Sequence, residues 1–470
     1  MSSNLKTLTS MSLRLLVSLF AFLFPLFGAE AGKTAQLTDV PTIYIETENG
    51  SNITSKEQYI KCRLVYVDGD SVATYPDTEI RGRGNSTWWN ADKKSYRIKF
   101  ATKQKFLGRH FANARSWTLL ANHGDKTMIR NALTYDLGRF MGMKFCPAAR
   151  FVDVYLNGAY RGTYQISDQV QVHKRRIDID EENGWVLEVA NNNSREDPCI
   201  TSSIYRIIYN LKNPKDEFLT LQHRIAIGQW IEKMERAVKG DNFADPELGY
   251  RAFFDEEDLV NWYVAAEITG NIDALYSIYM YKDADEDKVH LGPLWDLDLG
   301  YDNSSERSLL RAMEAYLGLG DRPFEQLIRR MWQDRWFSDA CAKRLNELVA
   351  NGLEQYLLDH IDSLSTAISQ TQAANYRIWP INGQVFSFEK HVYHNTYREY
   401  IADLKNFVKV HIPYLQQAFD QRCTAGIEQV DIPTTQHSND IYDLKGRRVS
   451  NHRSLPKGVY IQNGKKVITH

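Results

Sequence analysis

The chain has few cysteines, almost no net charge and only one long hydrophobic run. Its five cysteines lie far apart among 470 residues and form no C-x-x-C pair, which argues against a zinc knuckle and specifies no disulfide. The formal net charge is −2, so the chain lacks the excess of basic residues expected of a nucleic-acid-binding protein, and this argues against that class. The 43% of hydrophobic and 12% of aromatic residues nevertheless predict a large globular protein of two or three domain-sized units.

The one long hydrophobic run lies near the N-terminus. It extends from Leu15 to Phe27, follows Lys6 and Arg14, and precedes the small residues of Ala29–Ala31. This pattern predicts a cleaved signal peptide over residues 1–31 and a protein that is secreted or located at the cell surface. An uncleaved anchor is the alternative, but the run is shorter than the roughly 20 residues that span a bilayer. We expect no transmembrane segment after the signal is removed.

Hydrophobic periodicity divides the remaining chain into two lobes and predicts an α+β fold. Residues 32–215 show the alternation and Asn-Gly or Asp-Gly turns of a sheet-rich lobe, with strands expected at 41–47, 59–68, 78–83, 151–165 and 185–189. Residues 216–423 have apolar residues three and four apart, which predicts helices over 221–238, 254–268, 323–349, 353–371 and 388–410. A cleft between two such lobes is a natural place for a ligand.

A glycine-bearing turn precedes a strand with cations on one face. In RGRGNSTWWNADKKSYRIKF, residues 81–100, Gly82 and Gly84 form the turn, and Arg97 and Lys99 share a face of the following strand. Glycine lets backbone amides approach an anion closely, and a cation then neutralises the anion's charge, so the pattern predicts a phosphate cradle. A tight hairpin with an exposed Lys99 accounts for the same residues equally well.

Two aspartates flank a predicted β-hairpin. Asp273 precedes the runs Ser277–Lys282 and Val289–Trp295, and Asp296 follows them, so the pairing of the runs would bring the two aspartates together. Converging carboxylates are costly unless a cation or a proton separates them, which indicates a divalent metal site or acid/base chemistry. Each aspartate taken alone could instead cap a turn, although the cluster of Asp296, Asp298 and Asp302 argues against this.

A charged residue also stands inside a predicted strand, where Glu188 lies among the apolar residues of WVLEV. Such a residue is either at a sheet edge or the buried partner of a cation.

Four ordered motifs resemble the spore-coat kinase family called CotH. They are IRGRGNSTW, KKSYRIKF, YLNGAYRGTYQISDQV and GPLWDLDLG, and the resemblance covers roughly residues 41–415. It implies an atypical protein-kinase-like two-lobe fold and ATP-dependent phosphorylation of secreted or coat proteins. It further implies Mg²⁺ or Mn²⁺ as the cofactor, ATP as the co-substrate and a protein as the acceptor.

The resemblance also implies roles for single residues. Asp273 would be the catalytic aspartate, and Asp296 would hold the metal with Asp298 as a second candidate. Lys99, or its neighbour Arg97, would bind the nucleotide phosphates beneath the loop shaped by the glycines at positions 82 and 84. Glu188 is a further candidate for the nucleotide site.

Two departures from the family pattern bear on activity. A kinase catalytic loop usually has an asparagine shortly after its aspartate, yet residues 274–281 contain none, leaving Asn271 or Ser277 as a substitute metal ligand. Asp168 stands where a glutamate is expected. A catalytically silent surface or coat scaffold of the same fold is therefore an alternative. AMP transfer to a protein and, because aromatic residues adjoin the carboxylates, polysaccharide hydrolysis are further alternatives.

The C-terminal residues 424–470 predict a linker and a small β appendage. Residues 441–467 read as two short strand-turn segments, with turns at Gly446, Gly458 and Asn463-Gly464. The segment resembles the C-terminal sorting signal of the type IX secretion system, which implies an interaction with that machinery. The alternative is an appendage that only stabilises the protein.

Overall fold

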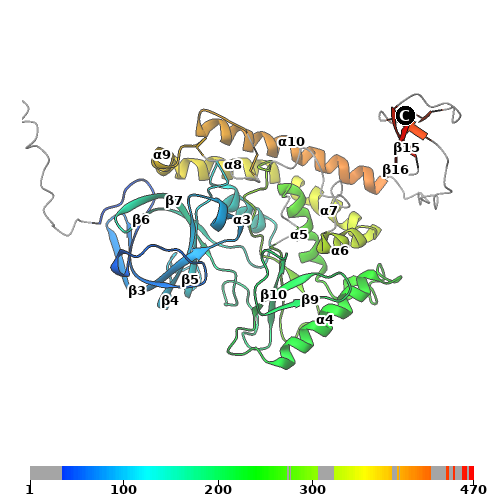
Figure 1. Cartoon of the computed structure of the whole chain (residues 1–470), viewed down its shortest axis with the longest axis horizontal. Coiled ribbons are helices and arrows are strands. Elements are labelled where there is room, and N and C mark those ends of the chain that lie inside the picture. The colour runs from blue at the N-terminus through cyan, green and yellow to red at the C-terminus, as the bar shows by residue number, and fades with distance from the viewer. Residues whose placement is uncertain are drawn as a thin grey trace, which may run out of the picture. The chain divides into compact units, whose positions relative to one another are not determined.

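The structure is a computed structural model that forms two compact units, residues 1–417 and 418–470 (Figure 1). It describes residues 34–271, 275, 277–304, 322–383, 389–390 and 392–424, together with the backbone of four strands in the C-terminal unit. The predicted signal peptide and Asp273 lie outside the described residues. In the described part of the chain, no helix combines the length and the apolarity needed to cross a membrane.

Seven strands of the larger unit close into a barrel (Figure 1). The strand order is β1-β2-β3-β4-β5-β7-β6, and the closing pair, β1 with β6, is parallel. Every second residue points inward, so Ile80 and Ile98 are fully buried. The bounds are β1 Thr42–Thr47, β2 Ile60–Asp68, β3 Ser71–Arg83, β4 Ser95–Gln104, β5 Ala114–Leu120, β6 Ala149–Leu156 and β7 Ala159–Asp168.

A second sheet has the order β12-β11-β8-β10-β9. The hairpin predicted from the sequence is confirmed, because β11 and β12 are antiparallel, and β11 also pairs with the central strand β8. The hairpin thus joins a sheet whose other strands come from the first half of the chain. The bounds are β8 Trp185–Ala190, β9 Cys199–Thr201, β10 Ile208–Asn213, β11 Tyr279–Lys282 and β12 His290–Leu291.

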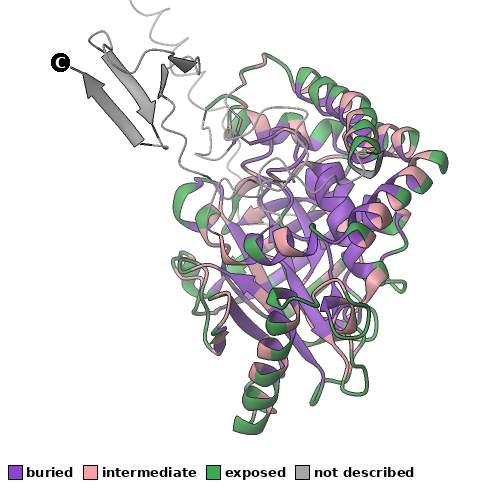
Figure 2. Ribbon diagram, turned by 90° about the vertical axis from the view of Figure 1, so that its right-hand side faces the viewer, coloured by how far each residue is buried: buried purple, intermediate pink, exposed green. Residues whose placement is uncertain are grey.

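Helices make up most of the larger unit after residue 220, and Figure 2 shows their buried faces turned toward a continuous buried core. Helix α5 lies inside this core, with almost every residue buried, and packs against α7. The bounds are α2 Ser86–Asn90, α3 Arg130–Phe140, α4 Leu221–Lys239, α5 Glu256–Thr269, α6 Pro323–Met331, α7 Arg335–Ala350, α8 Leu353–Ala367, α9 Ser369–Ile378 and α10 Tyr397–Thr424. Single-turn 3₁₀ helices occupy Glu48–Gly50 and Tyr250–Ala252.

The predicted α+β class is confirmed, whereas several finer predictions are wrong. The helix predicted over 323–349 is two helices, because the side chain of Asp334 accepts a hydrogen bond from the Trp336 amide and begins a new helix. The helix predicted over 353–371 is likewise divided into α8 and α9, and the one predicted from 388 begins at Tyr397. The N-terminal strands form a closed barrel beside a separate sheet, an arrangement that the two-lobe expectation did not contain.

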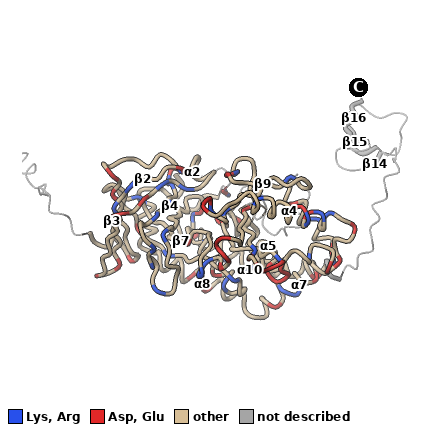
Figure 3. Tube along the Cα trace, turned by 90° about the horizontal axis from the view of Figure 1, so that it is seen from below, with Lys and Arg blue, Asp and Glu red and all other residues tan. Residues whose placement is uncertain are grey.

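The smaller unit contains a four-stranded sheet of order β14-β13-β15-β16. Its strands are β13 Ile441–Asp443, β14 Arg448–Val449, β15 Gly458–Gln462 and β16 Lys465–Thr469. A β appendage is therefore present, and its sorting role stays a prediction. Acidic and basic residues are interspersed along the larger unit, in keeping with the net charge of −2 (Figure 3).

Candidate functional site

A cavity lies between the barrel strands β3 to β5, helix α3 and the segment that follows β12. The segment contributes Trp295, Asp296 and Asp298, and the barrel side contributes Arg83 and Lys93. Two of the predicted metal-binding carboxylates therefore face two cations that were not predicted to bind a ligand. This combination of opposite charges around one cavity makes it the candidate site.

Asp296 has a backbone conformation that is unusual for a residue other than glycine. Its φ is 64°, in the left-handed region, which costs on the order of 1 kcal/mol or more and is found where the surrounding structure enforces it. Here the enforcing contact comes from α3, where the side-chain oxygen of Asn131 accepts a hydrogen bond of 3.0 Å from the Leu297 amide. On the other side, the Asn303 amide group donates to the carbonyl oxygen of Asp298 at 2.7 Å. Both aspartates thus sit on a segment that is fixed at two points.

The charge on Asp296 is only partly offset by its neighbours. The side chain is exposed to the cavity, but the protein around the cavity desolvates the carboxyl and raises its pKa. Arg83 acts in the opposite direction, and the carboxylate of Glu188 raises the pKa further. The Ser277 hydroxyl donates a hydrogen bond of 3.4 Å to Oδ2 of Asp296. A poorly compensated carboxylate that opens into a cavity fits a bound cation.

Cations line the barrel side of the site. The Arg83 guanidinium lies 5.1 Å from the centre of the Trp295 ring, and the ring therefore holds it over the segment that carries Asp296. In the β3–β4 register, Arg81 lies opposite Arg97. Burial lowers the pKa of Arg97, and the neighbouring guanidinium groups of Arg81 and Arg83 lower it further. Positive charge is concentrated here to a degree that an anionic ligand would relieve.

Lys93 lies deeper in the cavity wall and anchors it. Its ammonium donates hydrogen bonds to the carbonyl oxygens of Ala121 and Thr163 and, at 2.9 Å, to the side-chain oxygen of Asn375 in α9. Burial lowers the pKa of Lys93 to about 7. Because three acceptors already hold the ammonium, this lysine ties the barrel to α9 beside the site.

The two predicted phosphate-binding cations occupy different places. Lys99 lies on the same face of β4 as Arg97, as the alternation predicts, but its ammonium pairs with Glu79 at 3.2 Å. Neither Lys99 nor Arg97 is among the described residues that line the cavity, but Arg97 interacts electrostatically with Arg83, which does line it. Arg97 is therefore better placed than Lys99 to act on a ligand in the cavity.

Local structure explains why glycine occupies both glycine positions of the RGRG motif. A Cβ atom on Gly82 would overlap the indole ring of Trp88, which packs directly against the strand there. Gly84 has a φ of 100°, a conformation that other residues rarely adopt, and leads into the short helix α2. The geometry thus explains both glycines without a phosphate.

Glu188 pairs with a cation, as one of the two alternatives from its sequence context predicted, although both side chains are only partly buried. Its carboxylate pairs with Lys212 at 2.8 Å and accepts a hydrogen bond of 3.1 Å from the Tyr279 hydroxyl. It lies on the central strand β8, and its charge reaches Asp296. Glu188 therefore shapes the electrostatics of the site from the neighbouring sheet.

Asn271, the predicted alternative metal ligand, directly follows Gly270, the residue that caps the end of α5. Asn271 is buried, and its backbone N–H donates a hydrogen bond to the carbonyl oxygen of Ala266. It is not among the described residues that line the cavity. Ser277, the other substitute for the missing asparagine, is the residue that contacts Asp296. The catalytic role of Asp273 stays a prediction because that residue lies outside the described part of the chain.

Asp168, where a glutamate was expected, forms a buried ion pair. Its Oδ1 lies 2.7 Å from Nε of Arg176, and its Oδ2 accepts from the Ala148 amide at 2.9 Å. The shorter side chain therefore has its own cation and holds the barrel wall at the end of β7.

Sequence reasoning missed Arg83, Lys93 and Asn131. The alternation in IRGR contained a signal for Arg83, because it puts this residue on the strand face that bears Arg81. Lys93 begins the motif KKSYRIKF, but nothing in that motif marks it for a cavity, and Asn131 lies in helix α3 outside the four motifs, so only the folded structure brings these two residues to the cavity.

Comparison with known proteins gives one family. A family model described as CotH kinase protein matches residues 80–409, which include every residue of the cavity named above. Among curated proteins, a search finds no match to the chain.

Proposed function

Since the chain belongs to the CotH kinase family, we propose that it transfers a phosphoryl group from ATP to a hydroxyl group of a secreted or surface protein, with Mg²⁺ or Mn²⁺. One observation carries the proposal beyond the family: the cavity sets Asp296 and Asp298 opposite the guanidinium of Arg83. Phosphoryl transfer requires mainly the positioning of phosphates and the neutralisation of their charge, and these groups suit both tasks.

The residues present fit a divalent metal. The Asp296 carboxylate opens into the cavity with its charge incompletely offset, and Asp298 lies two residues further along the same fixed segment. Asp296 and Asp298 would hold the ion, which when bound neutralises charge on the nucleotide phosphates. Ser277 would orient the Asp296 carboxylate through its hydrogen bond.

The remaining roles follow from charge and position. Arg83, steadied by the Trp295 ring, would bind phosphate oxygens, and Arg97 would strengthen the positive field behind it. Asp273 would accept the proton of the acceptor hydroxyl. Because Lys99 is engaged with Glu79, we assign the phosphate-binding role to the arginines in preference to this lysine.

The test is phosphate incorporation by the mature protein with γ-labelled ATP and Mg²⁺. We expect incorporation by the wild type, and a decrease of at least about 100-fold for Asp296→Asn and for Asp273→Asn, since each removes a charge acting on the transferred group. Asp241→Asn, an exposed position just after α4, is the matched control and should retain full activity.

Two results would overturn the proposal. Label transferred from α-labelled ATP would indicate AMP transfer, because only that reaction leaves the α-phosphate on the acceptor. The absence of both incorporation and a Mg²⁺-dependent thermal shift with ATP would leave a scaffold protein of the same fold.

A companion experiment addresses the arginine. We expect Arg83→Met to weaken Mg-ATP binding about tenfold or more and Arg83→Lys to restore only part of it, because a lysine cannot make a bidentate phosphate contact. Lys99→Met should bind nucleotide nearly as well as the wild type. Binding is measured by titration calorimetry, and equal losses for Lys99→Met and Arg83→Met would contradict the assignment.

A further inference from the structure

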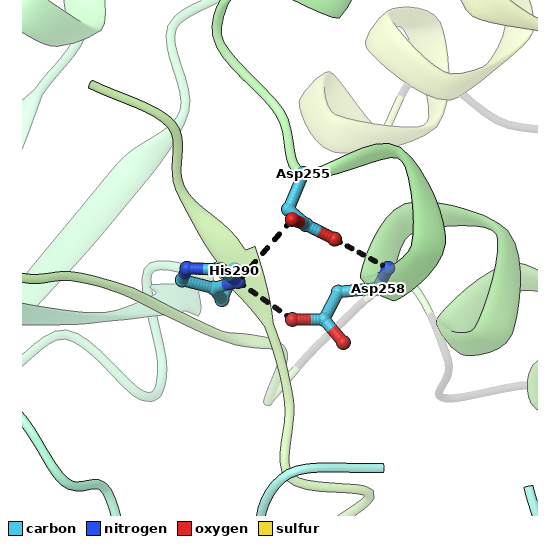
Figure 4. A group of neighbouring side chains, drawn as sticks. All are labelled: Asp255, Asp258 and His290. Atoms are coloured by element: carbon cyan, nitrogen blue, oxygen red, sulfur yellow. Dashed lines mark hydrogen bonds and ion pairs between the residues drawn. The ribbon is translucent and has the colours of Figure 1, made fainter. Parts of the chain in front are cut away.

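A second cluster of charged side chains lies apart from the cavity, where helix α5 meets strand β12 (Figure 4). Asp255 caps the N-terminus of α5, Asp258 lies in its first turn, and His290 is on β12. One ligand atom from each of these residues lies within 4.8 Å of the other two, and His290 and Asp258 are buried. Sequence reasoning did not anticipate this cluster, because its members come together only through the fold.

The ligand atoms converge on one point. Nδ1 of His290 lies 2.7 Å from Oδ2 of Asp258 and 4.0 Å from Oδ2 of Asp255. The other oxygen of Asp255, Oδ1, accepts the helix-capping hydrogen bond from the Asp258 amide, which orients its Oδ2 toward the histidine (Figure 4). Ligands around a tetrahedral metal at bond lengths of about 2.1 Å are separated by about 3.4 Å. The two observed distances lie on either side of this value, so small side-chain rotations would equalise them.

The second ring nitrogen of His290 is held by a carboxylate. Nε2 lies 2.8 Å from Oε2 of Glu286, in the turn between β11 and β12. Histidines that bind metals usually donate their other N–H to a carboxylate, which fixes the tautomer and makes the ligating nitrogen more basic. With the proton on Nε2, the lone pair of Nδ1 points at two carboxylate oxygens. That arrangement is repulsive unless a cation, or a second proton on Nδ1, lies between the three atoms.

The cation now nearest the cluster is a surface lysine. Nζ of Lys144 lies 3.1 Å from Nδ1 and 3.3 Å from Nε2 of His290, and the Tyr281 ring stacks on the imidazole with 5.2 Å between ring centres. Lys144 is an exposed residue with a long flexible side chain, so its ammonium can move into water at little cost in free energy. It supplies one positive charge beside the three carboxylates of Asp255, Asp258 and Glu286.

We propose that Asp255, Asp258 and His290 form a binding site for a divalent transition metal, with Zn²⁺ as the ion and water as the fourth ligand. The mixed imidazole and carboxylate ligands favour Zn²⁺ over Mg²⁺ or Ca²⁺, which prefer oxygen alone. Glu286 orients the histidine, and Lys144 leaves the cluster when the ion binds. The proposal does not rest on the proposed phosphoryl transfer, and the site shares no residue with the lining of the Asp296 cavity.

The ion would connect two elements that position the cavity. β12 ends at Leu291, and the chain then runs directly to Trp295 and Asp296. The site would tie this strand to the start of α5, whose other end leads into the segment with Asn271. Its effect is therefore expected as stabilisation of the larger unit, with no part in the chemical step.

The experiment is a Zn²⁺ titration of the metal-stripped mature protein at pH 7.5. Binding is measured by titration calorimetry, and thermal unfolding is the second readout. We expect one bound Zn²⁺ and a higher melting temperature for the wild type. Asp258→Asn should weaken binding at least about 100-fold, and Glu286→Gln about 10- to 100-fold, because it removes only the group that orients the histidine. Asp287→Asn, the exposed neighbour of Glu286, is the matched control and should bind as the wild type does.

Lys144→Gln separates a metal site from a set of ion pairs. If the cluster is a metal site, removing the competing ammonium should tighten Zn²⁺ binding several-fold. If the cluster is only a network of ion pairs around a charged imidazole, Lys144→Gln binds no Zn²⁺ either, and this result would overturn the proposal. Equal binding by Asp258→Asn and Asp287→Asn would overturn it as well.

Cobalt identifies the ligands. Substitution of Co²⁺ should give visible ligand-field bands without a thiolate charge-transfer band, because the proposed ligands contain no sulfur. A thiolate band would instead assign the bound metal to a cysteine and contradict the site. Asp296→Asn should leave the Co²⁺ spectrum and the Zn²⁺ affinity unchanged, which distinguishes this site from the proposed Mg²⁺ site.

Discussion

Position 82 requires glycine because an aromatic ring packs directly against it. The indole of Trp88 occupies the space that a Cβ atom would need, and Trp88 itself is buried in the barrel core. The glycine that looks like part of a phosphate loop in the sequence is thus a packing residue in the fold. Arg83, which follows it, lines the cavity together with Thr87 of the same motif.

The Gly82 site gives a stability prediction. We expect Gly82→Ala to lower the free energy of unfolding by about 1–3 kcal/mol, because the added methyl group forces the Trp88 ring to move. Gly228→Ala, in helix α4 with open space around it, should be neutral or stabilising by up to about 1 kcal/mol. Urea unfolding measures both.

A second-site change tests the cause. Trp88→Leu in the Gly82→Ala background should cost less than the sum of the two single changes, since the smaller side chain removes the overlap. Strict additivity of the two effects would show that the ring is not the reason for the glycine.

At the scale of elements, helix α10 fastens the end of α5. The imidazole of His411 is buried, and its Nε2–H donates a hydrogen bond of 2.8 Å to the carbonyl oxygen of Glu267. Gly270 ends α5 with a φ of 56°, and Phe407 lies close to it. The two helices thus meet immediately before Asn271, where the chain enters the segment that contains Asp273.

This contact should make stability depend on pH. Burial lowers the pKa of His411 from 6.5 to about 4, so the folded protein keeps this imidazole neutral where the unfolded chain protonates it. The stability that the neutral imidazole contributes is complete above pH 6.5 and is lost as the pH falls toward 4. The expected loss by pH 4 is roughly 2–3 kcal/mol.

Substitution isolates the His411 contribution from that of other titrating groups. His411→Gln keeps a side-chain N–H donor for Glu267 but does not titrate, so the difference in unfolding free energy between variant and wild type should change between pH 6.5 and 4. Urea unfolding at several pH values gives this difference. A difference that is constant over the range would show that His411 does not titrate as described.

The local pattern of apolar residues predicted the presence of single helices and strands better than it predicted where they end or how they pack together. Helix α4 ends within one residue of its predicted limit, because its apolar residues repeat at helical spacing, and the structure adds that Thr220 caps its start. The break before α7 depends on one side-chain hydrogen bond at Asp334, which hydrophobic periodicity does not register. Of the candidate site, Asp296 and Asp298 could be found in WDLD, whereas Arg83 and Trp295 are brought together only by tertiary packing.

At the scale of the whole molecule, the tail is a separate compact unit. Residues 418–470 form their own contacts, and their sheet pairs only strands of the tail in the described part of the chain. We expect a chain that ends at Thr424 to unfold with a free energy within about 1 kcal/mol of the full mature protein and to keep the same nucleotide affinity. A clearly lower melting temperature by calorimetry would show that the tail stabilises the larger unit.

The closure of the barrel has a consequence for how the chain acquires its structure. Ile43 on β1 pairs with Val154 on β6, so this ladder joins segments that are far apart in sequence. Contacts of this kind form slowly, because the entropy of the intervening loop must be lost before the pairing stabilises the chain. Until β6 has been synthesised and docked, the β1 edge stays open to other strands, so the nascent barrel should be most prone to aggregation during this interval.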